Sequence, residues 1–157
     1  MGIKPQFSQS DVISEIEKMI KTAEDKIIQS LFFVGEKAVE YARKNDPFKD
    51  HTANLRSSIS YIVVKDGVEI GSSAEKFQPT TAIDAKSKKS SVGTEGYQNG
   101  LEYARQLASS VTNGIALVVV AGMNYALHVE RSGYDVLSGA QINSERMFKS
   151  IISQLKL

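Results

Sequence analysis

The most regular pattern in the chain is a long row of apolar positions that starts at residue 12 and recurs at steps of three and four. The row consists of Val12, Ile16, Met19, Ile20, Ala23, Ile27, Leu31, Val34, Ala38 and Ala42. This spacing is that of one helix face. The Ser-x-x-acid segment Ser8–Asp11 predicts the N-terminal cap, and Asn45-Asp46-Pro47 predicts the end, because a residue before proline avoids the helical conformation. We therefore predict one helix of about thirty residues.

The length of this helix bears on its surroundings. At 1.5 Å per residue it would extend for roughly 50 Å, which exceeds the width of a compact domain of this size. Part of it should therefore overhang and need a partner. The segment Leu31–Val34 adds four adjacent apolar residues, which wrap more of a helix than one neighbour covers, so Phe32 and Phe33 are candidates for oligomer contacts. A kink or break near Gly35 is the alternative.

Strand patterns follow. Alternating residues from Ile59 to Val64, then Asp66-Gly67, then Val68 and Ile70 predict a β-hairpin with a two-residue turn. Before it, Ala53–Ser57 lacks β-branched residues and predicts a short helical turn capped by Thr52. The later run Ile115–Ala121 is apolar throughout, which predicts a strand that is covered on both faces or lies in the middle of the sheet.

Two more helices are predicted. One follows Tyr97, Leu101, Ala104, Leu107, Ala108 and Val111 and is closed by Asn113-Gly114. The other opens with a capping box at Ser138–Gln141 and has an apolar side of Ile142, Phe148, Ile151, Ile152 and Leu155. Between Ser72 and Gly96 the composition shifts to Ser, Thr and Lys, which predicts a long loop that is mobile in the isolated subunit.

The order of these elements predicts the fold class. It is α+β, with a small antiparallel sheet of three to four strands, a long N-terminal helix, a middle helix and a C-terminal helix. A chain of 157 residues with 41% hydrophobic and 24% charged residues is expected to form a single domain over 1–157, with the lysine-containing loop 72–96 inside it.

Charge and composition narrow the classes of function. A formal net charge of +1 gives no global field that would attract nucleic acid or a membrane surface. The absence of cysteine removes disulfides, thiolate nucleophiles and zinc–thiolate sites. No run approaches the roughly 18 apolar residues of a membrane span, and residues 1–10 lack the apolar core of a signal peptide. We expect no membrane association.

Candidate chemistry centres on the two histidines. His128 and Glu130 lie two residues apart, so on a helix they point about 200° from each other and only on a strand could they share a metal with His51. No Gly-x-Ser-x-Gly elbow, phosphate loop or dinucleotide fingerprint occurs. We interpret Asn124–Glu130 as a helical turn with Tyr125 and Val129 packed inward, and we expect no catalysis, metal or cofactor.

Two short motifs carry a resemblance to a known family. The chain resembles the head-tail connector or tail-completion proteins of tailed bacteriophages, also described as phage tail-component or neck proteins. Thr52, Leu55, Arg56, Ser58 and Ile59 match the family segment Thr-Gly-x-Leu-Arg-x-Ser-Ile. Tyr125, Ala126, Val129 and Glu130 match Tyr-Ala-x-Tyr-Val-Glu-Phe-Gly-Thr, with His128 where an aromatic residue is usual. Ala53 replaces the first glycine, and the second appears one place late, at Gly133.

The resemblance implies a structural assembly protein of a phage or prophage. Such a subunit would form a homo-oligomeric ring between capsid portal and tail, with neighbouring connector and tail proteins as partners. It would be found in the virion, or in the bacterial host cytoplasm during assembly. Arg56 and Glu130 each lie at the edge of an apolar segment, where a charge is best tolerated in a pair, so we predict an ion pair between them.

Alternative functions come from other residues. One is a small metal-dependent hydrolase that uses His51, His128 and Glu130. Another is a regulatory binding module that holds an acidic partner through the loop lysines Lys86, Lys88 and Lys89. In a connector, the same lysines would make weak, salt-sensitive, non-specific contact with DNA in the conduit. A solvated loop without DNA contact is the other interpretation of these lysines.

Overall fold

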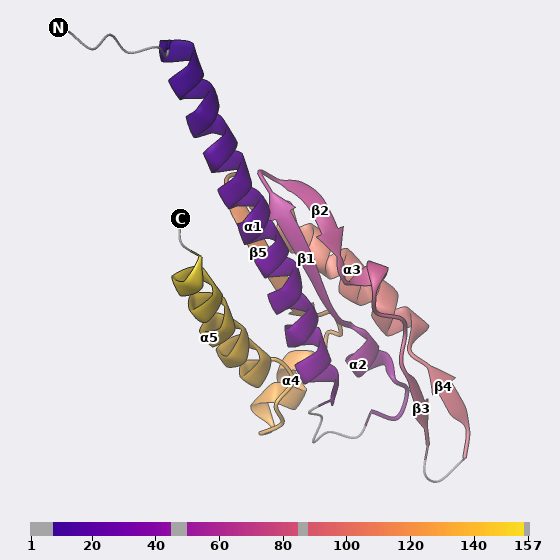
Figure 1. Cartoon of the computed structure of the whole chain (residues 1–157). Helices are drawn as coiled ribbons and strands as arrows, with labels where there is room; N and C mark the ends of the chain where they lie inside the picture. The colour runs from indigo at the N-terminus through magenta and orange to yellow at the C-terminus, as the bar shows by residue number, and fades with distance from the viewer. Residues whose placement is uncertain (1–7, 45–49, 85–87, 156–157) are drawn as a thin grey trace, which may run out of the picture.

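The computed structural model describes residues 8–44, 50–84 and 88–155 and has the predicted α+β architecture (Figure 1). Three antiparallel strands form the main sheet in the order β2-β1-β5. They are β1 (Ile59–Lys65), β2 (Val68–Ser72) and β5 (Ile115–Ala121). The turn between β1 and β2 places Asp66 and Gly67 at φ 50° and 80°, as the Asp-Gly pair predicts.

The helices cover both faces of this sheet. They are α1 (Gln9–Lys44), α2 (Asn54–Ser57), α3 (Thr94–Ala108), α4 (Ala126–Arg131) and α5 (Ser138–Gln154). Helix α1 crosses one face with α5 beside it, and α3 covers the other face (Figure 1). The sheet is therefore the middle of three layers.

Both faces of β1 are buried because its side chains alternate between the two helical layers. Ile59, Tyr61 and Val63 belong to the core on the α1 side. Ile62 and Val64 belong to the core on the α3 side. The strand β5 follows the same alternation and packs against both layers. Of its residues only Val120 is fully buried, because β5 lies at the edge of the sheet, so the predicted cover on both faces is partial.

Helix α1 is longer than predicted and has no break. Its N-terminus is a capping box, in which the Ser8 Oγ accepts a hydrogen bond from the Asp11 N–H at 3.2 Å and the Ser8 N–H donates to the Asp11 carboxylate at 2.8 Å. The alternative of a break near Gly35 is wrong, because the helix is continuous from Gln9 to Lys44. Glycine at this position allows the close approach of the Tyr61 ring, which would lie 2.7 Å from a Cβ atom. The predicted stop at residues 45–47 lies outside the described residues.

The N-terminal half of α1 projects beyond the rest of the molecule (Figure 1). Buried residues of this helix start only at Leu31. The predicted overhang is therefore confirmed. No helix within the described residues is long and apolar enough to cross a membrane.

The segment predicted as a loop over residues 72–96 contains more regular structure than expected. It holds the 3-10 turn η1 (Ser73–Glu75) and the antiparallel pair β3 (Thr81–Ile83) and β4 (Ser90–Val92), and α3 begins at Thr94. Strands of three residues are too short to show a periodic pattern in a Ser- and Thr-rich segment. The assignment of the whole segment as a loop was wrong.

Two helix ends also differ from prediction. Helix α3 ends at Ala108, and Gly114 instead begins the approach to β5, where its N–H donates to the Asp66 Oδ1 at 2.7 Å. At the start of α5, Ser138 lies inside the helix and Leu137 is the N-cap residue, without a side-chain cap of its own. The predicted capping box at Ser138–Gln141 is therefore wrong, and the cap comes from outside the helix.

Candidate functional site

The two motif segments meet at one end of the molecule. Leu55 of α2, Ala126 of α4 and Val136 form a small buried cluster, and Val129 packs against it. Tyr125, by contrast, is 38% exposed, so the prediction that it packs inward is wrong. Ala126, the next residue, takes the inward position. The structure thus places the two motifs in one joint between the sheet and the helices, although about 70 residues separate them in the sequence.

The turn at the first motif depends on an unusual backbone conformation. Ala53, the N-cap residue of α2, has φ 63° in the left-handed region that glycine adopts easily. The predicted cap by Thr52 is displaced by one residue, although the Asn54 N–H does reach the Thr52 hydroxyl at 3.4 Å. The Arg56 N–H is satisfied from outside the turn, by the Asp50 carboxylate at 2.9 Å.

Ser58 and Ile59 connect this turn to the end of β5, just before the second motif. The Ser58 hydroxyl donates to the Leu55 carbonyl at 2.7 Å, and the Ser58 carbonyl accepts from the Gly122 N–H at 3.1 Å. Ile59 starts β1 opposite Ala121, the last residue of β5. The sheet therefore holds α2 and α4 at a fixed separation.

Tyr125 is linked to the first motif at the surface of the joint. Burial raises the pKa of its hydroxyl, the carboxylate of Asp50 adds to this rise, and the Thr52 side chain offsets part of it. These groups belong to the two motif segments and to the residues just before them. Tyr125 therefore contributes polar contact across the joint and leaves the packing to Ala126.

Glu130 caps helix α5. Its carboxylate accepts hydrogen bonds from the backbone N–H groups of Val136 at 3.0 Å, Leu137 at 2.8 Å and Ser138 at 3.3 Å. Burial raises the pKa of Glu130, but hydrogen bonds from the Ser138 side chain and from these amides outweigh it and lower the pKa below the usual glutamate value. The carboxylate thus satisfies amides that the first turn of the helix leaves unpaired.

The predicted ion pair between Arg56 and Glu130 is wrong. The ion pairs among the described residues do not join these two side chains, because both oxygens of Glu130 face the start of α5. Burial lowers the pKa of the Arg56 guanidinium.

Sequence patterns did not identify Arg43, which organises the same region from the last turn of α1. Its guanidinium donates to the Ser57 carbonyl at 3.1 Å, the Ile59 carbonyl at 3.0 Å and the Gln78 carbonyl at 2.9 Å. It also lies 5.2 Å from the centre of the Phe77 ring. Burial lowers its pKa to about 10, which leaves it charged at neutral pH. A basic residue in a last helical turn is common, so the sequence gives no signal for this role.

The histidines are not brought together with Glu130 as ligands. The His51 Nδ1 lies 3.5 Å from the Asp84 carboxylate and its side chain is 65% exposed. His128 is exposed on α4, and Glu130 holds backbone amides. Across residues 8–44, 50–84 and 88–155, no group of three metal-ligating side chains is positioned to hold a metal ion.

Two of the loop lysines, Lys88 and Lys89, lie in the turn between β3 and β4. Lys88 has φ 57° and its N–H donates to the Asp84 carbonyl at 2.9 Å, while the Lys89 carbonyl accepts from the Asp84 N–H at 3.0 Å. Lys86 lies outside the described residues. The backbone of the turn therefore holds Lys88 and Lys89 next to Asp84.

The aromatic pair on α1 divides between core and surface. Phe32 packs against the core and its ring meets the Tyr61 ring edge-on, with centroids 6.4 Å apart. Phe33 is 48% exposed and lies 6.0 Å from the Lys37 ammonium. Only Phe33 is thus available for a contact with another chain.

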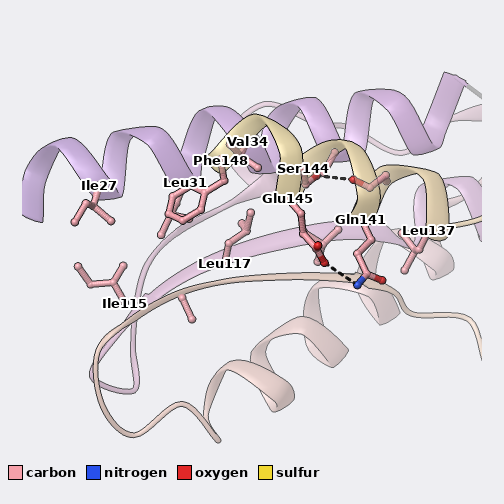
Figure 2. Close-up of a pocket in the computed structure, with 14 residues that line it drawn as sticks. Ile27, Leu31, Val34, Ile115, Leu117, Leu137, Gln141, Ser144, Glu145 and Phe148 are labelled. Carbon is pink, nitrogen blue, oxygen red and sulfur yellow. Dashed lines mark hydrogen bonds between the residues drawn. The ribbon is translucent and has the colours of Figure 1, made fainter. Parts of the chain in front are cut away.

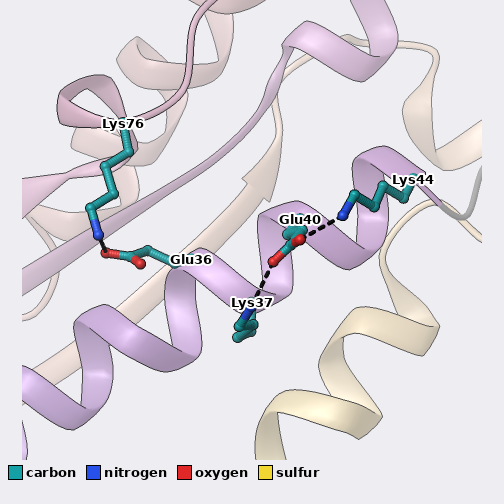
Figure 3. Close-up of polar contacts among 5 residues, drawn as sticks. All are labelled: Glu36, Lys37, Glu40, Lys44 and Lys76. Carbon is teal, nitrogen blue, oxygen red and sulfur yellow. Dashed lines mark hydrogen bonds and ion pairs between the residues drawn. The ribbon is translucent and has the colours of Figure 1, made fainter.

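Charged contacts run along the same stretch of α1 (Figure 3). Glu40 bridges Lys37 at 2.8 Å and Lys44 at 2.6 Å, and Glu36 holds Lys76, which follows η1, at 2.6 Å. Hydrogen bonds from Lys37 and then Lys44 lower the pKa of Glu40 to about 2. These side chains are partly or largely exposed, so the pairs contribute little to stability.

An apolar groove of about 490 Å³ lies between α1, α5 and β5 (Figure 2). Ile27 and Leu31 of α1, Leu117 of β5 and Phe148 of α5 line it. Gln141 and Glu145, which are hydrogen-bonded to each other at 3.0 Å, lie on the α5 wall. The groove opens beside the strand at the sheet edge, so an apolar segment of another chain could enter it.

Comparison of the chain with protein-family models, with curated proteins and with solved structures gives no match.

Proposed function

We propose that the protein is a structural assembly subunit of a phage or prophage, a ring-forming head-tail connector or tail-completion protein. The observation that carries the proposal is the projecting half of α1. Five large apolar side chains on it are between 41% and 66% exposed, namely Val12, Ile13, Ile16, Met19 and Ile20. Apolar surface of this extent on one element favours association with another protein surface.

The joint between the motifs supports the family. The family motif has glycine where this chain has Ala53, and Ala53 adopts the left-handed conformation that would favour glycine there. Gly133, one place later than the second motif's glycine, has φ 90°. The glutamate of that motif, Glu130, secures the C-terminal helix. The left-handed turn at Ala53 and the cap by Glu130 support the proposal.

Electron microscopy together with native mass measurement tests this function. The expected result is a closed ring of one discrete mass, whose population increases with protein concentration. A double variant, Ile13→Ser with Ile20→Ser, should lower the ring population, because it removes exposed apolar surface without touching the core. Lys18→Ser on the same half of the helix is the matched control and should leave assembly unchanged. A protein that stays monomeric throughout its soluble range would contradict self-assembly.

Contact with DNA in the conduit is a second part of the proposal. It depends on Lys88 and Lys89, with Lys86 as a third cation. Replacement of all three by serine should abolish DNA binding at low salt, and binding by the natural chain should fall steeply at moderate salt. Binding that the replacement leaves unchanged would exclude these lysines from the DNA path.

A further inference from the structure

The exposed stripe on α1 and the wall of the groove are parts of one continuous helix face. Ile13, Ile16 and Ile20 are spaced by three and four residues, as are Ile27, Leu31 and Val34 farther along. At 3.6 residues per turn, the six side chains fall within a sector of roughly 60°. The second three line the groove of their own chain, whereas the first three are 50%, 51% and 56% exposed.

The stripe and the groove have similar lengths. The stripe, taken from Ile13 to the next apolar residue Ala23, extends for about 15 Å. The α1 wall of the groove, from Ile27 to Ala38, extends for about 16 Å. The groove is apolar on its α1 and β5 walls, and the half-buried ring of Phe148 closes its α5 side (Figure 2). An amphipathic helix that presents isoleucine at three- and four-residue spacing is a suitable occupant for such a groove.

The stripe cannot reach the groove of its own chain. Helix α1 is continuous from Gln9 to Lys44, and its second half is itself a wall of that groove. A stripe that enters the groove must therefore come from another copy.

We propose that the projecting half of α1 of one copy occupies the groove between α1, α5 and β5 of the next copy. This inference rests on the proposed function and names the surfaces that build the ring. Donor and acceptor are different surfaces, so the contact is heterologous and repeats from copy to copy until it closes. One such contact involves fewer side chains than the roughly 20–30 residues per partner of a standard interface. Each contact is therefore weak alone and is reinforced when every copy makes two.

Cysteine cross-linking tests the contact directly, because the natural chain contains no cysteine. Ile16→Cys places a thiol on the stripe, and Glu145→Cys places one on the exposed α5 rim of the groove. The two variants are mixed, treated with a short thiol-reactive cross-linker and resolved by mass. Each chain has one thiol, so every product joins two copies. Lys18→Cys, which lies opposite the stripe on the same exposed half of α1, replaces Ile16→Cys in the matched control.

The expected product is the heterodimer of Ile16→Cys with Glu145→Cys, in several-fold excess over the product with Lys18→Cys. A product of Ile16→Cys with itself in place of the heterodimer would overturn the inference in favour of stripe-to-stripe pairing. Absence of cross-linking throughout the soluble range, or equal products with Lys18→Cys, would also overturn it. Rings seen by microscopy without the heterodimer would leave the proposed function standing and refute this contact. The heterodimer without closed rings would support this contact and refute the proposed ring.

Discussion

The cap that Glu130 provides to α5 leads to a prediction about stability. Glu130→Gln keeps the size of the side chain and one carbonyl oxygen, but it removes the charge and the second acceptor. The variant loses the acceptor that the Ser138 N–H reaches at 3.3 Å and the attraction between a carboxylate and the start of the helix. Val136 and Leu137 can still donate to the remaining oxygen.

The size of the effect follows from these losses. Loss of a helix cap costs about 0.5–2 kcal/mol, and the charge at a helix N-terminus contributes about 0.3–1 kcal/mol. Since part of the cap remains, we expect Glu130→Gln to lower the free energy of unfolding by about 1–2 kcal/mol at neutral pH. For a domain of this size, that corresponds to a fall in Tm of roughly 2–8 °C.

The pH dependence gives an independent test. The folded-state pKa of Glu130 is lowered, so its charged form stabilises the fold above the usual glutamate pKa, and this stabilisation is lost as pH falls through the lowered value. The difference in Tm between the natural chain and Glu130→Gln should therefore shrink in acid, where the protonated side chain resembles glutamine.

Thermal unfolding followed by circular dichroism measures both effects. The control is Glu102→Gln, at an exposed position on α3, where we expect a change within about 0.5 kcal/mol. The cap would be refuted if both variants unfolded alike at neutral pH, or if the difference stayed constant into acid.

Three further predictions concern packing and backbone conformation. Gly100→Ala should lower the free energy of unfolding by about 1–3 kcal/mol, because the new methyl group would lie 2.3 Å from a backbone carbonyl oxygen. The control Gln98→Ala, on the exposed side of the same helix, should leave stability unchanged, and equal urea midpoints for the two variants would contradict the prediction. Ala53→Gly should change the free energy of unfolding by less than about 1 kcal/mol in calorimetry, because the removal of left-handed backbone strain offsets the lost burial of one methyl group. A larger loss of stability would show that the backbone at Ala53 is not strained. Phe32→Ala should cost about 2–4 kcal/mol in urea unfolding and Phe33→Ala less than about 1 kcal/mol, whereas the reverse order would place Phe33 in the core.

The sequence determined the elements that are long, periodic or marked by special residues. Helix α1 repeats its apolar spacing over many turns, and its Ser8–Asp11 cap is a local pattern that forms as predicted. The β1–β2 turn follows from Asp66-Gly67, because few other pairs accept positive φ at both positions. Even the overhang could be predicted, since helix length depends on residue number alone.

Tertiary structure decided the contacts between segments that are distant in sequence. Glu130 caps α5 instead of pairing with Arg56, and Arg43 reaches three carbonyl groups, because the fold brings unpaired backbone groups to those side chains. The sequence shows which side chains carry charge but not which backbone groups remain unpaired near them. The edge position of β5, the β3–β4 pair and the groove likewise depend on which elements pack together. A single sequence does not encode that packing as a local pattern, because the energy that selects it comes from burial shared among several elements at once.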